Sequence, residues 1–211
     1  MSAPTLEVVR HPLVEHKLSI LRDKRTGSMR FRALLEEITL LMTFHATRHL
    51  EGEETTVDTP LETARVRRIR EDRLVVVAVL RAGLGMIEGV LRLIPGARVG
   101  HLGFYRNEET LQPVRYYGKL PPDIGRRSVL LVDPMLGTGG TATAAASELK
   151  EHGARDIRFM CLVAAPEGAA RMAAEHPDVP VYAAALDARL NEVGYIVPGL
   201  GDAGDRIFGT V

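Results

Sequence analysis

The sequence predicts an α/β fold in which a central, mainly parallel sheet is flanked by helices. Its middle part contains five short, nearly continuous apolar runs, which are typical of parallel strands covered on both faces. These runs are LVVVAVL (residues 74–80), RVGHLGFY, SVLLVD, IRFMCLVAA and VPVYAAAL. Helical patterns at 86–94, 140–152 and 167–176 lie between several of them. This alternation predicts ligand binding at the carboxyl ends of the strands.

Two elements precede the sheet. Residues 29–50 carry apolar side chains at helical spacing and predict a long amphipathic helix, with Ser28 as its N-cap. The segments TTVDTP and ARVRRI then alternate in the manner of a small β-hairpin.

Composition predicts one globular domain, residues 1–211, in the cytoplasm. The hydrophobic fraction of 45% in 211 residues is enough for one well-buried core. Lys plus Arg equals Asp plus Glu, so no overall charge favours nucleic acid or a membrane, and any phosphate site must be built locally. The N-terminus lacks the pattern of a signal peptide, and no apolar run approaches the length of a membrane span. Cys161 lies in an apolar run and is predicted to be a buried thiol.

The stretch VLLVDPMLGTGGTAT, residues 129–143, predicts a phosphate site. Asp133 ends a buried strand and faces the crevice, and residues 137–141 form a glycine-rich turn at the start of a helix. Unpaired N–H groups and the positive end of the helix dipole favour an anion there, and the hydroxyls of Thr138 and Thr141 add donors. Because a carboxylate repels phosphate, Asp133 is expected to bind the hydroxyls of a sugar to which the phosphate is attached.

Three other motif matches do not fit their contexts. A phosphate-binding loop of the P-loop type needs a Lys where Thr141 stands. The G-x-G-x-x-A match at 137–142 begins too far after its strand for a dinucleotide fold, because Asp133 and three further residues intervene. His45 and His49 have zinc-ligand spacing, but HATRH lacks the catalytic Glu and no third ligand is evident.

The glycine-rich stretch resembles the ribose-phosphate loop of type I phosphoribosyltransferases, which use phosphoribosyl pyrophosphate. Most of that superfamily has two adjacent acids here, whereas the second position in this chain is Pro134. That departure resembles the uracil phosphoribosyltransferases, and so do LRAGLGM, YRNEETLQPV, LVAAPEG and GYIVPGLGDAGDRIFGT. The resemblance extends from VRHPLVEHKL nearly to the last residue. It implies the type I phosphoribosyltransferase fold with a β-flap and a C-terminal hood.

The phosphoribosyl pyrophosphate ligands follow from this resemblance. Arg81, in LRAG at a strand end, suits a pyrophosphate because a guanidinium gives bidentate contacts to phosphate oxygens. The segment FYRNEETLQPVRYYGKL is expected to form the flap that excludes water; Arg106 then reaches the substrate, and Glu108 and Glu109 are interpreted as solvated charges. The full expected set is Arg81, Arg106, Asp133, Pro134, Met135, Leu136, Gly137, Thr138, Gly139, Gly140, Thr141 and Asp202.

The glycine-rich C-terminal segment is expected to bind uracil. Exposed peptide groups can match the two carbonyls and N3–H of uracil and reject cytosine, whose pattern is reversed. The resemblance places this recognition at Ile196, Gly201, Asp202 and Ala203, with Asp202 also facing the phosphoribosyl pyrophosphate or its metal. Tyr195 is interpreted as a core residue.

The implied reaction joins uracil N1 to ribose C1 and releases pyrophosphate. The expected catalytic residues are Asp133, Arg106 and Asp202, and no obvious base for N1 stands in the motifs. The expected cofactor is Mg²⁺, held mainly through the substrate rather than by dedicated protein ligands.

Two alternatives stay open at this point. One is a phosphoribosyltransferase of different base specificity, and the other is an RNA-binding regulator on the same fold, which the zero net charge disfavours. The resemblance also implies a homodimer or a higher homo-oligomer, for which the apolar helix at 29–50 is a candidate surface, and a possible GTP effector.

Overall fold

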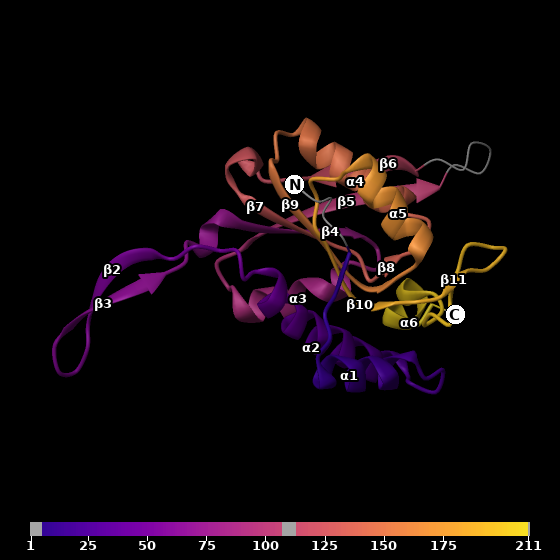
Figure 1. Cartoon of the computed structure of the whole chain (residues 1–211), viewed down its shortest axis with the longest axis horizontal. Coiled ribbons are helices and arrows are strands. Elements are labelled where there is room, and N and C mark those ends of the chain that lie inside the picture. The colour runs from indigo at the N-terminus through magenta and orange to yellow at the C-terminus, as the bar shows by residue number, and fades with distance from the viewer. Residues whose placement is uncertain (1–5, 107–112, 211) are drawn as a thin grey trace.

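A mainly parallel sheet forms the centre of the molecule, as predicted. The computed structural model describes residues 6–106, without the Arg106 side chain, and residues 113–210. In this part of the chain an eight-stranded sheet has the order β1-β10-β9-β7-β4-β5-β6, and β8 pairs with β9. All pairings are parallel except β5 with β6 (Figure 1). The strands are β1 Glu7–Val8, β4 Leu74–Leu80, β5 Arg98–Arg106, β6 Pro113–Lys119, β7 Ser128–Val132, β8 Met135–Leu136, β9 Asp156–Ala164 and β10 Val181–Leu186.

Helices cover both faces of this sheet (Figure 1). One face carries α1 Pro12–Arg22, α2 Ser28–Ala46 and α3 Leu84–Leu93, and the other carries α4 Gly140–Glu151 and α5 Pro166–Glu175. Two short helical turns, η1 Glu71–Arg73 and η2 Ile124–Arg126, precede β4 and β7.

Strand β4 shows why its sequence is apolar at every position. Leu74, Val76 and Ala78 belong to the core beneath α1 to α3. Val75, Val77 and Val79 belong to the core beneath α4 and α5. Successive side chains of a strand point to opposite faces, so a strand covered on both sides has no polar face. Cys161 of β9 is buried in the second core, as predicted.

The predicted helix at 29–50 differs from the observed α2 at both ends. Ser28 is the first helical residue, and Gly27, with an extended backbone, takes the N-cap position. The helix ends at Ala46, and the residues after it form hydrogen-bonded turns closed by Arg48 N–H to His45 and Leu50 N–H to Thr47. The chain must turn here to reach the next strand, so helical spacing alone placed the end four residues too late.

The predicted hairpin is β2 Glu53–Asp58 paired with β3 Thr63–Arg68. It projects from the body as an arm (Figure 1). Most of its residues are exposed, and Leu61 at the tip is 95% exposed. The arm therefore contributes little to the core of its own chain.

The C-terminal hood consists of β11 Arg189–Leu190, β12 Ile196–Val197 and α6 Ala203–Phe208. Arg206 attaches it to the helical layer: its guanidinium donates to the carbonyls of Leu200 (2.8 Å) and Asp23 (2.7 Å) and lies 4.5 Å from the centre of the Phe31 ring. A second attachment joins Arg22 to Asp187 through two hydrogen bonds of 2.6 and 2.7 Å. These contacts fix the hood beside the carboxyl ends of the strands.

Within residues 6–106 and 113–210, the structure contains no helix long and apolar enough to cross a membrane.

Candidate active site

The glycine-rich turn follows β7 and leads directly into α4, as the sequence predicts, with the short strand β8 before it. Gly139 has φ +79° and is the N-cap of α4, a backbone conformation that favours glycine. The first N–H groups of α4 have no partner within the helix and point toward the turn. Neighbouring α5 packs tightly here, since a Cβ added to Gly168 would lie 2.3 Å from the Gly137 carbonyl oxygen. The turn is therefore held in a fixed shape. The Gly140 N–H makes a long hydrogen bond to Thr138 Oγ1 (3.5 Å), and the start of α4 borders a cavity where an anion can bind.

Asp133 stands directly after β7, at the base of this turn. Burial raises its pKa to about 7, nearby Asp202 adds repulsion, and a hydrogen bond from the Met135 N–H (3.3 Å) opposes the rise. Asp133 is only half-buried and lines a cavity, and among the described residues no Lys, Arg or His forms a salt bridge with it. A carboxylate held partly out of water without such a partner is poorly stabilised. Hydroxyl donors from a bound sugar would supply the missing hydrogen bonds.

The segment after Asp133 contains a short strand that the sequence does not predict. Met135 and Leu136 form β8 and pair with β9. Pro134 is buried, and its carbonyl accepts hydrogen bonds from the N–H groups of Leu162 (2.9 Å) and Val163 (3.1 Å). Pro134 thus joins the loop to the sheet, whereas residues 137–141 face the cavity.

The turn after β4 brings Arg81 to the hood. Gly83 cannot be replaced there without movement, because an added Cβ would lie 2.6 Å from the carbonyl oxygens of Val79 and Val132. Arg81 is 59% exposed, lies 3.6 Å from the Asp205 carboxylate and sits over the Phe208 ring. Its guanidinium is therefore accessible to a ligand beside α6.

A cavity of about 250 Å³ joins the hood to Asp133. Ile196, Gly201, Asp202 and Ala203, all predicted for uracil, line it together with Ala82 of the Arg81 turn, Asp133, Met135, Gly137, Gly194, Tyr195 and Gly204. One Asp202 oxygen accepts the Asp205 N–H at 2.9 Å and caps α6. The interpretation of Tyr195 as a core residue is wrong, since its side chain is 47% exposed and borders this cavity.

A second cavity of about 280 Å³ lies on the other side of Gly137. Gly137, Thr138, Gly140, Thr141 and Gly194 line it, with Pro113 and Arg171. Sequence reasoning missed Arg171, Gly194 and Ala82. Arg171 stands one helical turn after Gly168 in PEGAARM, so the two share a face, and that spacing was the available signal.

Some predicted residues lie outside the described part of the chain. Strand β5 ends at Arg106, so the backbone of Arg106 lies at the root of the expected flap. The side chain of Arg106 is outside the described part of the chain. Glu108 and Glu109 lie outside the described residues. The role expected of Arg106 stays a prediction.

The comparisons with known proteins give one consistent result. The sequence model of the family described as uracil phosphoribosyltransferase matches residues 8–210. The chain belongs to the uracil phosphoribosyltransferase family. The uracil phosphoribosyltransferase of Thermus thermophilus is 59% identical over 205 residues, 97% of this chain and 99% of that protein. The one of Geobacillus kaustophilus is 56% identical over 203 residues, 96% and 97% of the two chains.

Solved structures agree on the fold. A protein of Aquifex aeolicus aligns with a TM-score of 0.92 at 38% identity and covers 97% of this chain and 98% of its own. A hypoxanthine-guanine phosphoribosyltransferase of Bacillus anthracis aligns with a TM-score of 0.50 at 17% identity, over 74% of this chain and 78% of its own. The second likeness shows the type I phosphoribosyltransferase fold alone.

Proposed function

We propose that this chain transfers the 5-phosphoribosyl group of phosphoribosyl pyrophosphate to N1 of uracil and gives UMP and pyrophosphate. The observation that carries the proposal is a continuous site at the carboxyl ends of β4 and β7. There the Arg81 turn, Asp133 with its glycine-rich loop and the hood border cavities that share Gly137 and Gly194. The family match supports the same activity.

The loop at 137–141 binds the 5-phosphate in this proposal. Its N–H groups and the hydroxyls of Thr138 and Thr141 supply donors without a compensating acid. Asp133 accepts hydrogen bonds from the ribose hydroxyls, and its charged form is the stronger acceptor. Arg81 contacts the pyrophosphate from the opposite end of the cavity.

The hood binds uracil in this proposal. Ile196 packs on the ring, and peptide groups of residues 201–203 meet its carbonyl and N3–H edge. Gly201 at φ +79° turns the backbone here, a conformation that other residues rarely adopt. Cytosine would leave buried groups mispaired, so the pocket favours uracil.

The chemistry needs charge stabilisation and positioning. The bond from C1 to the pyrophosphate oxygen breaks, the bond from N1 to C1 forms, and N1 loses its proton. Positive charge develops on the ribose and negative charge on the leaving pyrophosphate. Arg81 and Arg106 stabilise the charge on the pyrophosphate, and Asp133 and Asp202 lie toward the ribose.

The residues present fit a Mg²⁺ ion held mainly by the substrate. Asp133 and Asp202 border one cavity, and the charge of Asp202 contributes to the raised pKa of Asp133. The described residues contain no cluster of three or more acidic, His or Cys side chains, and Mg²⁺ needs only one or two carboxylates beside phosphate oxygens. When bound, the ion would neutralise pyrophosphate charge.

Three further expectations stay predictions: a homodimer or larger homo-oligomer, a GTP effector and a cytoplasmic location. The exposed Met29 (80%) and Phe44 (73%) on α2 support an assembly through this helix. Sedimentation equilibrium, with and without GTP, would measure both the assembly and its response.

The test is nucleotide formation from phosphoribosyl pyrophosphate and Mg²⁺ with uracil, cytosine, hypoxanthine and adenine offered separately. We expect UMP from uracil and no product from the other bases. Product from hypoxanthine or adenine instead would favour a different base specificity. If no base reacts, salt-dependent RNA binding would favour the regulator with this fold.

A further inference from the structure

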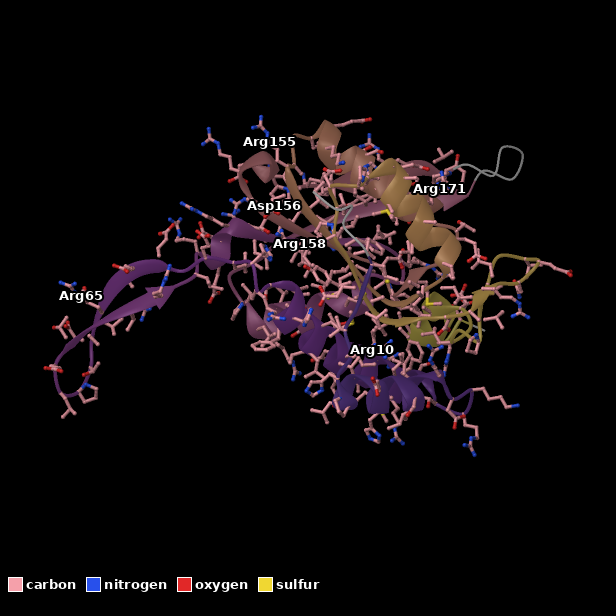
Figure 2. All side chains as sticks on the ribbon, viewed as in Figure 1. Arg10, Arg65, Arg155, Asp156, Arg158 and Arg171 are labelled. Atoms are coloured by element: carbon pink, nitrogen blue, oxygen red, sulfur yellow. The ribbon has the colours of Figure 1, made fainter. Side chains whose placement is uncertain are left out.

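Arg171 of α5 lies directly against the glycine-rich loop. A Cβ added to Gly139 would lie 3.1 Å from the Arg171 Cβ, so the aliphatic stem packs beside the turn. A Cβ added to Gly140 would lie 3.2 Å from its Nη1, so the guanidinium reaches over the first residue of α4. Figure 2 shows Arg171 on the helical layer above the sheet, to the right of Arg155, which directly precedes β9 and so lies at the end of the sheet away from the glycine-rich loop.

The cavity beside Arg171 has the character of an anion site. Its other described lining residues are Pro113, Gly137, Thr138, Gly140, Thr141 and Gly194, so Arg171 is the one charged side chain among them. The first residues of α4, Gly140 and Thr141, and the preceding Thr138 border the same space. Cation, dipole and neutral donors thus converge here, and none of these described lining residues carries a carboxylate.

Glu175 orients this guanidinium. The Arg171 Nε donates to the Glu175 Oε1 at 2.7 Å, one helical turn away, and this bond lowers the pKa of Glu175. The pair uses Nε, and Nη1 lies on the side of Gly140. An exposed pair of this spacing contributes little to folding, so a variant without it should fold normally.

We propose that Arg171 is a binding residue for the 5-phosphate of phosphoribosyl pyrophosphate and UMP. Its Nη groups close the side of the phosphate that the loop leaves open, while residues 137–141 bind the other oxygens. The proposal rests on the proposed function, because the ligand is the phosphate of that same substrate. It adds a charged contact to a loop whose own donors are all neutral.

The experiment compares UMP with uridine, which differ by this phosphate. Calorimetric Kd values for both are measured with the wild-type chain and with Arg171→Ala, Arg171→Lys and Arg155→Ala. We expect Arg171→Ala to weaken UMP binding roughly tenfold or more and to leave uridine unchanged. Arg171→Lys should recover part of the loss, and Arg155→Ala, which removes an exposed arginine far from the site, should match the wild type.

Steady-state kinetics supply the second readout. Arg171→Ala should raise KM for phosphoribosyl pyrophosphate by a similar factor, with KM for uracil unchanged, and Glu175→Gln should give a smaller rise. An unchanged ratio of UMP to uridine affinity in Arg171→Ala overturns the proposal while the function stands. A wild-type chain that neither binds UMP nor forms it overturns the proposed function and this proposal with it. If Arg171→Ala does not fold, Arg171→Gln, which keeps part of the stem, is judged by the same ratio.

Discussion

Replacing Asp133 by Asn should stabilise the ligand-free protein while impairing its activity. Burial raises the pKa of Asp133 from 3.8 to about 7, so the folded chain holds this proton more tightly than the unfolded chain does. The stability of the wild type therefore falls as pH rises from about 4 to about 7 and is level above that range. Asparagine carries no charge and keeps an oxygen for the Met135 N–H.

The size of the effect follows from the shift. Three pKa units correspond to roughly 4 kcal/mol at about 1.4 kcal/mol per unit. Asp133 borders a cavity that admits water, so we expect about half of this, roughly 2 kcal/mol. A pH of about 5.5 lies roughly midway between the two pKa values, so only about half of the destabilisation has developed there and the gain should shrink to about 1 kcal/mol.

Urea unfolding at about pH 5.5, 7 and 8.5, followed by circular dichroism, measures this difference for wild type and Asp133→Asn. Asp123→Asn is a control of opposite sign, because the Arg127 guanidinium lowers the pKa of Asp123 and the charged form is the stabilising one. The reasoning would be refuted by an Asp133→Asn variant that is no more stable than the wild type at about pH 8.5, or by a gain independent of pH. The same variant should lose at least about a hundredfold in kcat/KM, since an amide replaces the charged acceptor for ribose hydroxyls.

Three further predictions concern the loop and the hood. Gly168→Ala places a methyl group 2.3 Å from the Gly137 oxygen and should raise KM for phosphoribosyl pyrophosphate about tenfold, with KM for uracil unchanged in initial-rate assays. Gly199→Ala places a methyl group 2.0 Å from the Ile196 carbonyl oxygen, at a backbone φ of +61°, and should raise KM for uracil while leaving KM for phosphoribosyl pyrophosphate unchanged. If either variant changed the two KM values equally, the assignment of phosphate to the loop and uracil to the hood would be contradicted. Asp187→Ala removes the acceptor of the Gly199 N–H (2.7 Å) and leaves the Arg22 guanidinium with the Gly199 carbonyl (2.6 Å) but without its carboxylate partner. It should lower the free energy of unfolding by about 3 kcal/mol in urea titrations, and a loss below about 1 kcal/mol would show that water replaces the pair.

The sheet could be predicted from the sequence because its signals are local. Strands covered on both faces need continuous apolar runs, and β4, β7 and β9 all have them. The ends of α2 could not be placed in the same way, since helical spacing persists beyond the point where the chain turns. Strand β8 was missed because two residues carry no periodicity, and its pairing with β9 is made by backbone groups.

The site could be predicted where chemistry is consecutive in the sequence. Asp133 and the glycine-rich turn occupy one stretch, and the hood residues Ile196 and Gly201 occupy another. Arg171 was missed because it reaches the loop across the packing of α5 on α4, a contact between segments about thirty residues apart. Tyr195 was misplaced because an aromatic residue in an apolar segment reads as core, whereas the hood leaves it at the cavity edge.

The most direct test of the whole account is a crystal structure of this chain with UMP. We expect the phosphate at the N–H groups of residues 137–141, the ribose hydroxyls on Asp133, and the uracil edge against residues 201–203 with Ile196 on its face. A phosphate bound elsewhere, or a uracil ring outside the hood cavity, would contradict the assignment of these two segments.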